Sequence, residues 1–289
     1  MTAVLSATSA TRLVALLGDP VAHSLSPRFQ NAAFAAAAVD GVYIALRCDA
    51  STLPGLLAGI ARAGGAGNVT IPHKAQAASI IEVATGAVRR TRACNTFWLE
   101  HGRIHGDNTD VAGFRAAVHA LIGSPAGARV LLLGAGGAAS AAVCALLDDG
   151  VGAIDVVGRS PERVRALVAA FDAGGRLRAA PGAAPSADER YDLVVNATPL
   201  GLHAGDPWPL DLDRFPGVGA VLDLVYTPGE TAWVRDARRR GIVAADGREM
   251  LLAQGAAAFE RWWGRPAPID AMRRALEAAA ATPAGAGDA

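Results

Sequence analysis

The residue best suited to proton transfer in this chain is its single lysine. Of the 27 lysine and arginine residues, only Lys74, in the stretch "NVTIPHKAQ", is a lysine. An ammonium can release and regain a proton when its surroundings are suitable, whereas a guanidinium stays protonated in proteins. Lys74 is therefore a candidate general acid and base, although an arginine-rich composition could also leave one lysine by chance.

A carboxylate that could share this proton ends the stretch "HGDNTD" at Asp110. We expect Asp110 to lie near the junction of two domains, where it would hold the ammonium and take part in proton transfer. The spacing fits equally well an N-cap for the helix "VAGFRAAVHAL", and both roles stay open. His101 and His105 are four residues apart, but Gly102 predicts a hairpin turn there and not a metal-binding helix.

A glycine-rich turn is the second chemical feature of the sequence. In "VLLLGAGGAAS", Gly134, Ala135, Gly136, Gly137 and Ala138 lie between a predicted strand and a predicted helix. The glycines allow backbone N–H groups to approach a pyrophosphate, and the N-terminus of the helix favours its negative charge. The turn therefore predicts a bound dinucleotide.

The end of the next strand favours NADP over NAD. A protein that binds NAD usually places Asp or Glu about 20 residues on, to hold the ribose 2′-hydroxyl. Here that strand ends in Gly158, Arg159 and Ser160, followed by Arg163, and Asp155 lies too early within it. Two guanidinium groups and a hydroxyl suit a 2′-phosphate, although surface arginines at a helix start are the alternative.

Apolar runs alternate with helical patterns around these residues, which predicts an α/β protein of two domains. Residues 1–110 and 248–289 would form a substrate-binding and catalytic α/β domain, to which the C-terminal helices return. Residues 111–247 would form a doubly wound, Rossmann-type nucleotide-binding domain with five strands. In the first domain, Ser26 should cap a helix over 26–39, and Pro72 should open the helix that carries Lys74.

Composition argues against several classes of function. The net charge is zero, so no basic face for nucleic acid is expected. Apolar runs end well short of the ~18 residues of a membrane span, and the N-terminus does not resemble a signal peptide. Cys48, Cys94 and Cys144 are far apart, which predicts reduced thiols in a cytoplasmic protein without a metal site.

Eight stretches together resemble the shikimate dehydrogenase family over nearly the whole chain. They are "HSLSP", "NVTIPHK", "ACNT", "GDNTD", "GAGGAAS", "NATPLG", "DLVYTP" and "DG-x-x-ML-x-x-Q", in the family's order. The resemblance implies an NADP-dependent oxidoreductase that reversibly reduces 3-dehydroshikimate to shikimate, a step of chorismate and aromatic amino-acid biosynthesis. It also implies that Lys74 and Asp110 are the catalytic pair.

The resemblance further implies which residues bind the two ligands. Those expected to bind the substrate are Ser24 and Ser26 at its carboxylate, Tyr226 near it, Thr70, Asn95, Asp110 and Gln254 at ring hydroxyls, and Lys74. Those expected to bind NADPH are Gly134, Ala135, Gly136, Gly137, Ala138, Gly158, Arg159, Ser160, Arg163, Thr198, Leu224 and Gly247. Gly158 departs from the Asn that is common in the family, which removes one contact available to the adenosine ribose or phosphate.

Other functions stay open at this point. A relative with relaxed specificity could oxidise quinate as well or use NAD, and a non-catalytic sensor could bind shikimate without turnover. A methylene-tetrahydrofolate dehydrogenase would need an apolar slot for a pterin, whereas this chain offers hydroxyls and amides. We expect a small-molecule substrate and neither a nucleic acid nor a membrane as partner, and a homodimer is left open.

Overall fold

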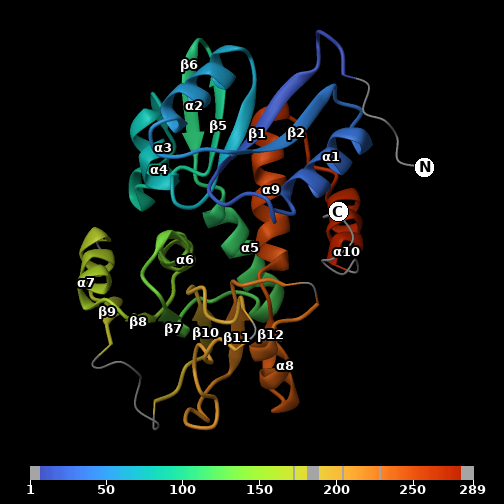
Figure 1. Ribbon diagram of the computed structural model, residues 1–289. Coiled ribbons are helices and arrows are strands. Elements are labelled where there is room, and N and C mark those ends of the chain that lie inside the picture. Colours follow the sequence, from blue (N-terminus) through green and yellow to red (C-terminus); the bar gives the residue numbers. More distant parts are fainter. Residues whose placement is uncertain (1–6, 172, 181–188, 204, 228, 281–289) are drawn as a thin grey trace. The chain divides into compact units, whose positions relative to one another are not determined.

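The chain forms two compact units, traced in Figure 1. The computed structural model describes residues 7–171, 173–180, 189–203, 205–227 and 229–280. Unit 1 consists of Met1–Thr109 and Gln254–Ala289, and unit 2 consists of Asp110–Ala253. The chain thus leaves unit 1 once, completes unit 2 and returns to unit 1.

Unit 1 is built on a mixed β-sheet. Its six strands in the described part of the chain have the order β2-β1-β3-β5-β6-β4. The strands are β1 (Arg12–Gly18), β2 (Gly41–Arg47), β3 (Ala66–Val69), β4 (Val83–Ala84), β5 (Thr96–Glu100) and β6 (Arg103–Asp107). β1 pairs in parallel with both β2 and β3, because helices link these strands, whereas β5 is antiparallel to β3 and β6.

The predicted hairpin is the link between β5 and β6. His101 and Gly102 form its two-residue turn with φ angles of 49° and 73°, and Glu100 pairs with Arg103. Two successive positive φ angles are typical of the tight turn that matches the twist of antiparallel strands. The two histidines therefore lie on a hairpin, with His101 in the turn and His105 on β6, and the prediction against a helix here is confirmed.

Helices surround both sheets. Unit 1 contains α1 (Ser26–Ala36), α2 (Leu53–Arg62), α3 (Lys74–Ile80), α4 (Gly86–Thr91) and α10 (Ile269–Ala280). Unit 2 contains α5 (Asp110–Ile122), α6 (Gly137–Asp148), α7 (Pro161–Ala170) and α8 (Ala232–Arg239), and α9 (Arg248–Trp263) begins in unit 2 and ends in unit 1. Among the helices that the structure describes, none is both long enough and apolar enough to cross a membrane.

The end of α9 and the whole of α10 belong to unit 1. Trp263 of α9 packs edge-on against Phe34 of α1, with 5.3 Å between the ring centroids, and Trp262 packs on Tyr43 at 6.0 Å. The indole N–H of Trp262 donates to Thr96 Oγ1 at 3.0 Å, so its polar atom is satisfied inside the core. Buried aromatic area therefore holds the end of α9 on the first sheet.

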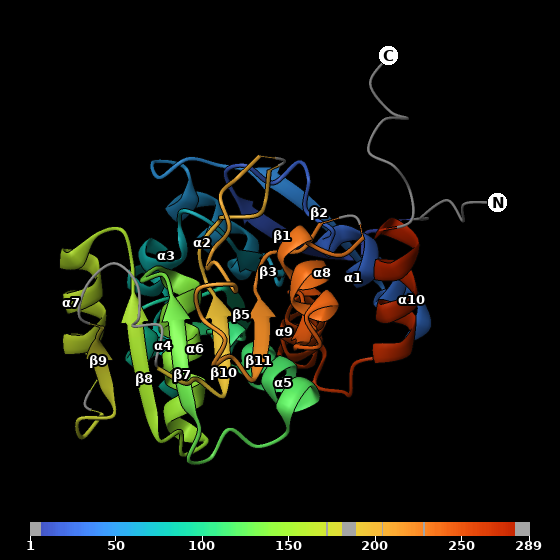
Figure 2. The same ribbon diagram turned by 90° about the horizontal axis from the view of Figure 1, so that it is seen from below.

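Unit 2 is a doubly wound sheet with parallel strands, as the sequence predicted. Its described strands have the order β12-β11-β10-β7-β8-β9, and Figure 2 shows β8, β7, β10 and β11 side by side. They are β7 (Arg129–Leu133), β8 (Ala153–Val157), β9 (Leu177–Ala179), β10 (Leu193–Asn196), β11 (Ala220–Asp223) and β12 (Val243–Ala245). Counted from the first strand of the unit this is the order 3-2-1-4-5-6 of dinucleotide-binding domains.

Three local predictions were wrong. The sequence predicted five strands in this sheet, but the short β9 adds another. Ser26 does not cap α1, because the helix already includes it and Leu25 occupies the cap position. Pro72 does not open α3, which begins two residues later at Lys74, with His73 at the cap position.

Candidate active site

Several unit 1 residues expected to bind substrate lie at the ends of the central strands β3 and β5 of its sheet. Thr70 directly follows β3, and Asn95 directly precedes β5, which is antiparallel to β3. The backbone N–H of Val69 donates to the carbonyl of Asn95 at 2.9 Å, which fixes these two segments side by side. On α9, Gln254 reaches the same place, since Asn95 Nδ2 lies 3.5 Å from Gln254 Oε1.

Ser24 and Ser26 lie in the segment that leads from β1 into α1. The backbone N–H of Ser26 donates to Ser24 Oγ at 3.2 Å, which ties the two residues together. Ser26 is buried, with 8% of its surface exposed, whereas Ser24 is half-buried. Ser24 is therefore the more accessible of the two hydroxyls.

Lys74 is held by its backbone at the start of α3. Its carbonyl accepts from the N–H of Cys94 at 2.8 Å, and the turn before it is closed by His73 N–H donating to the carbonyl of Thr70 at 2.9 Å. The imidazole of His73 is buried and its Nε2 lies 2.9 Å from the carbonyl of Cys48. His73 thus anchors the turn. Lys74, which is half-buried, follows it as the first residue of α3.

Cys94 is a buried thiol next to this lysine. Burial raises the pKa of Cys94 to about 12, and the charge of Lys74 opposes that rise only weakly. The thiol also donates to the carbonyl of Thr96 at 3.1 Å. A protonated, packed thiol of this kind is not a nucleophile.

The segment before Asp110 is fixed by hydrogen bonds within unit 1. Asn95 Oδ1 accepts from both the N–H and the hydroxyl of Thr109, at 2.8 and 3.1 Å. The carbonyl of Asp107 accepts from the N–H of Asn95 at 3.0 Å, and the carboxylate of Asp107 pairs with Arg261 of α9 at 2.9 Å. Asp110 itself is the first residue of α5 and is buried.

In unit 2, the residues expected to bind the cofactor follow the carboxyl ends of parallel strands. Gly134–Ala138 follow β7, Gly158–Arg163 follow β8, and Thr198, Leu224 and Gly247 follow β10, β11 and β12. β7 and β10 are neighbours, so the order of the sheet reverses between them. In doubly wound sheets a ligand binds outside the carboxyl ends of the strands at this reversal.

The turn after β7 has the geometry that a pyrophosphate needs. Gly134 has φ +111°, and a Cβ there would lie 2.7 Å from the carbonyl oxygen of Ala197, so only glycine fits. Gly136 and Gly137 open α6, and a Cβ on either would meet nothing within 4 Å. Backbone N–H groups at this helix start can therefore be approached closely by an anion.

The segment after β8 presents arginines around a capped helix. Ser160 Oγ accepts from the N–H of Arg163 at 3.3 Å and donates to Glu162 at 2.9 Å, so it caps α7. Arg159 and Arg163 are exposed. At Gly158 a Cβ would lie 3.0 Å from Val164 Cγ2, so the Asn of the family would need a small local shift.

Two buried polar residues that the sequence analysis did not single out hold the end of β10 against that of β11. Asn196 Oδ1 accepts from the N–H and hydroxyl of Thr198 at 3.0 and 2.6 Å, and Asn196 Nδ2 donates to Asp223 at 2.8 Å. Burial raises the pKa of Asp223, although hydrogen bonds from Thr231, Asn196 and Val225 oppose this. Both lie inside the quoted motifs "NATPLG" and "DLVYTP".

Tyr226 follows β11 in unit 2. Burial raises the pKa of the Tyr226 phenol, so the side chain is a neutral hydroxyl at ordinary pH. No group of three or more His, Cys, Asp and Glu residues that could hold a metal ion occurs among the residues described here. The residues expected to bind the substrate carry hydroxyls, amides, one amine (Lys74) and one carboxylate (Asp110).

Comparison with known proteins gives one consistent family. Residues 16–97 match the model of the shikimate dehydrogenase substrate binding domain, residues 117–199 that of shikimate / quinate 5-dehydrogenase, and residues 247–277 that of the shikimate 5′-dehydrogenase C-terminal domain. The chain belongs to the shikimate dehydrogenase family.

Individual relatives agree with this assignment. The chain is 41% identical to the shikimate dehydrogenase (NADP(+)) of Moorella thermoacetica, with 94% of each chain covered. It is 42% identical to that of Rubrobacter xylanophilus, over 92% of this chain and 95% of the relative. The crystal structure of shikimate 5-dehydrogenase from Thermus thermophilus in complex with NADP(H) and shikimate superimposes with a TM-score of 0.83 at 37% identity, covering 93% and 100% of the two chains.

Proposed function

We propose that this protein is an NADP-dependent shikimate dehydrogenase, which reversibly reduces 3-dehydroshikimate to shikimate. In this proposal, residues 1–110 and 248–289 bind the substrate and residues 111–247 bind NADP. The observation that carries the proposal is a relative of that activity at 41% identity over 94% of both chains. The site residues support it, because hydroxyls and amides collect in unit 1 and the glycine turn lies at the carboxyl edge of the sheet in unit 2.

The proposed chemistry needs one proton for each hydride. Bound NADPH supplies the hydride to the carbonyl carbon. Lys74 donates a proton from its ammonium to the carbonyl oxygen, which becomes the hydroxyl of shikimate. In the oxidation, the neutral amine of Lys74 takes that hydroxyl proton back. Asp110 is proposed to hold the ammonium and to bind a ring hydroxyl.

The other proposed site residues would bind and orient the substrate and the cofactor. Ser24, Ser26 and Tyr226 are proposed to bind the substrate carboxylate; Tyr226 can donate because burial keeps its phenol protonated. Asn95 and Gln254 are proposed to bind ring hydroxyls together with Thr70. For the cofactor, the N–H groups at Gly134–Ala138 would hold the pyrophosphate, and Gly158, Arg159, Ser160 and Arg163 the adenosine with its 2′-phosphate. Thr198, Leu224 and Gly247 would line the nicotinamide end.

Replacing Lys74 by Arg tests the mechanism most directly. The positive charge stays while the exchangeable proton is lost, so we expect kcat to fall by ~10²-fold or more. Binding of shikimate, measured by calorimetry, should persist. The reverse exchange at an exposed position, Arg214→Lys, is the control and should leave kcat unchanged, since its side chain is 80% exposed. Near-normal turnover of the Lys74→Arg enzyme would remove Lys74 from the mechanism.

A cofactor and substrate comparison separates the proposal from its alternatives. Initial rates are measured with NADP and NAD, each with shikimate and with quinate. We expect the highest kcat/KM for NADP with shikimate, because the arginines after β8 favour a 2′-phosphate. Equal rates with both cofactors would contradict the NADP assignment, and binding of shikimate without turnover would indicate a sensor.

We also propose a cytoplasmic location, and a homodimer stays open. Cys48, Cys94 and Cys144 are free and buried, which suits a reducing compartment. Light scattering coupled to size-exclusion chromatography measures the mass directly, and a mass of one chain at micromolar concentration would reject the dimer.

A further inference from the structure

A buried tyrosine supports one of the residues proposed to bind the substrate. Tyr43 lies on β2 and only 1% of it is exposed. Its hydroxyl donates to Asn68 Oδ1 at 2.8 Å. Asn68 Nδ2 in turn donates to the carbonyl of Asn95 at 3.0 Å. All three residues belong to unit 1.

The direction of each hydrogen bond in this chain can be derived. A backbone carbonyl only accepts, so the atom of Asn68 that faces Asn95 must be the amide nitrogen. Its oxygen then faces Tyr43, which must be the donor. Burial raises the pKa of Tyr43, so the phenol keeps the proton that it donates. The protons therefore run in one direction, from Tyr43 to Asn68 and on to the carbonyl of Asn95.

Asn95 continues the same order at the other end. Its Oδ1 accepts from the N–H of Thr109 at 2.8 Å, which fixes the side-chain oxygen on that side. The amide nitrogen must then face Gln254, whose Oε1 lies 3.5 Å away. The side-chain amide of Asn95 is thus fixed in one orientation, with its oxygen toward Thr109 and its nitrogen toward Gln254.

We infer that Tyr43 is a positioning residue of the substrate site, which sets the position of Asn95 through Asn68. This inference rests on the proposed function, since it concerns the site for the same hydroxylated ring acid. Without the phenol hydroxyl, Asn68 Oδ1 is left as a buried acceptor that has lost its donor. The Asn68 amide would then adopt another orientation and release the carbonyl of Asn95 before substrate binds.

The Tyr43→Phe enzyme tests the inference. Leaving a buried acceptor unpaired corresponds to about a tenfold change in an equilibrium constant, so we expect KM for shikimate to rise about tenfold. The values of kcat and of KM for NADP should change by less than about twofold, because Lys74 and the glycine turn are untouched. Calorimetric titration with shikimate should show the same loss of affinity.

Tyr191→Phe is the matched control. Tyr191 is also a buried tyrosine, at 4% exposure, and its hydroxyl donates to Asp155 at 3.0 Å in unit 2. It contacts none of the proposed site residues in the described hydrogen bonds. We expect this variant to lower the unfolding temperature and to leave both KM values unchanged, whereas a purely structural role of Tyr43 would give the same pattern for Tyr43→Phe.

A double-mutant cycle with Asn68→Asp shows whether Tyr43 acts through Asn68. Asn68→Asp keeps the acceptor for Tyr43 but removes the donor to the Asn95 carbonyl, so KM for shikimate should rise in this variant. If Tyr43 acts through Asn68, adding Tyr43→Phe to Asn68→Asp will raise KM for shikimate by clearly less than the change in the wild-type background. Should Tyr43→Phe not fold, Asn68→Asp alone tests the inference.

The possible results distinguish the inferred role of Tyr43 from the proposed function of the protein. A Tyr43→Phe enzyme with wild-type KM and affinity for shikimate would overturn this inference and leave the proposed function intact. A wild-type protein that binds shikimate without oxidising it would contradict the proposed function, while the titrations would still decide the role of Tyr43. A wild-type protein that neither binds nor oxidises shikimate would overturn both.

Discussion

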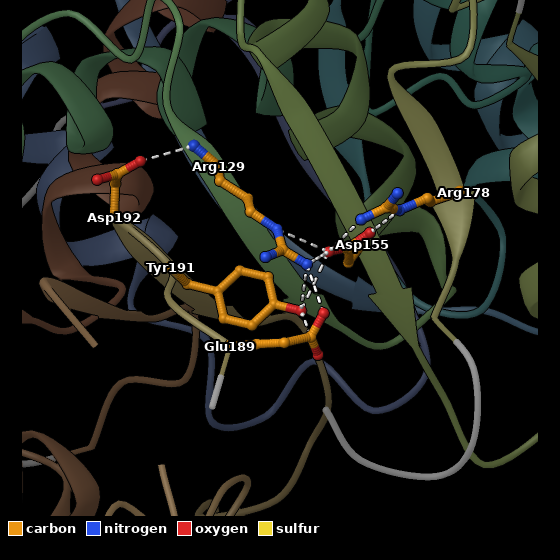
Figure 3. A network of polar contacts seen from close by, with 6 residues as sticks. All are labelled: Arg129, Asp155, Arg178, Glu189, Tyr191 and Asp192. Carbon is orange, nitrogen blue, oxygen red and sulfur yellow. Dashed lines mark hydrogen bonds and ion pairs between the residues drawn. The ribbon is translucent and has the colours of Figure 1, made fainter. Parts of the chain in front are cut away.

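Asp155→Asn should destabilise the protein strongly without affecting the cofactor. Figure 3 shows Asp155 on β8 between the guanidinium groups of Arg129 and Arg178. Arg129 donates to its carboxylate at 2.7 Å and to Glu189 at 2.6 Å, and the hydroxyl of Tyr191 donates to it at 3.0 Å. The charges of two carboxylates and two guanidinium groups thus cancel around Asp155, which is only 1% exposed.

The size of the effect follows from which charges remain. An Asn at this position would keep one acceptor and turn an NH₂ group toward guanidinium donors. Removing one member of a buried ion pair costs about 3–5 kcal/mol. The side chain of Arg178 is 58% exposed and that of Arg129 31%, so water can replace part of what they lose. We therefore expect about 3 kcal/mol, equivalent to a fall of about 6–12 °C in unfolding temperature.

The loss should depend on pH. Burial alone would raise the pKa of Asp155, but hydrogen bonds from Arg178, Arg129 and Tyr191 outweigh it, and the pKa lies below its ordinary value. A lowered folded pKa means that the stabilisation exists above the unfolded pKa of about 4 and disappears as the pH falls through the folded value. Wild type and Asp155→Asn should therefore differ at pH 7 and converge in acid.

Urea and thermal unfolding at pH 7 and in acid measure this, together with KM for NADP. Asp213→Asn is the control: Asp213 pairs with Arg240, but its side chain is 75% exposed, so the unfolding midpoint should not move. Equal stability of Asp155→Asn and wild type at pH 7 would refute the reasoning. A large rise in KM for NADP in a stable variant would place Asp155 in the cofactor site instead.

Two further predictions concern the cofactor turns. Gly134→Ala should raise KM for NADP by at least about tenfold, because φ is +111° and the new Cβ would lie 2.7 Å from the Ala197 carbonyl oxygen; steady-state kinetics test this. Gly59→Ala, where a Cβ meets nothing within 4 Å inside α2, is its control and should not change KM. Arg159→Ala should lower kcat/KM with NADP about tenfold and leave the NAD value unchanged, since one charge-assisted phosphate contact is lost; an equal loss with both cofactors would contradict a 2′-phosphate role.

Much of the fold could be predicted because buried parallel strands appear as continuous apolar runs. "VLLLG" and "AIDVVG" are both strands of the unit 2 sheet, and the glycine between strand and helix marks the reversal point. β9 could not be recognised, because only Leu177 of its three residues is buried and its neighbours Arg178 and Ala179 are exposed. The cap prediction for Ser26 was wrong because Ser before Pro is typical of a cap, whereas this helix begins at Ser26 itself and Leu25 takes the cap position.

The short motifs of the candidate site could be recognised because each is continuous in sequence. Their supporting residues could not, because a supporting contact depends on strand register. Tyr43 and Asn68 lie on β2 and β3, on either side of β1, and only that arrangement brings the phenol to the amide. No spacing in the sequence indicates the pair.

A common position along the strand nevertheless links these supporting residues. Asn196 and Asp223 are the last residues of β10 and β11, and Asn68 is the last but one of β3. Each is a buried polar residue in an apolar strand, and each bonds to a segment that carries proposed site residues. Asp155 is buried and polar too, but it lies in the middle of β8 and bonds to Arg129 at the start of β7, Arg178 in β9 and Tyr191 just before β10. Because ligands bind beyond the carboxyl ends of parallel strands, a buried polar residue near that end supports a site, whereas one in the middle supports the sheet.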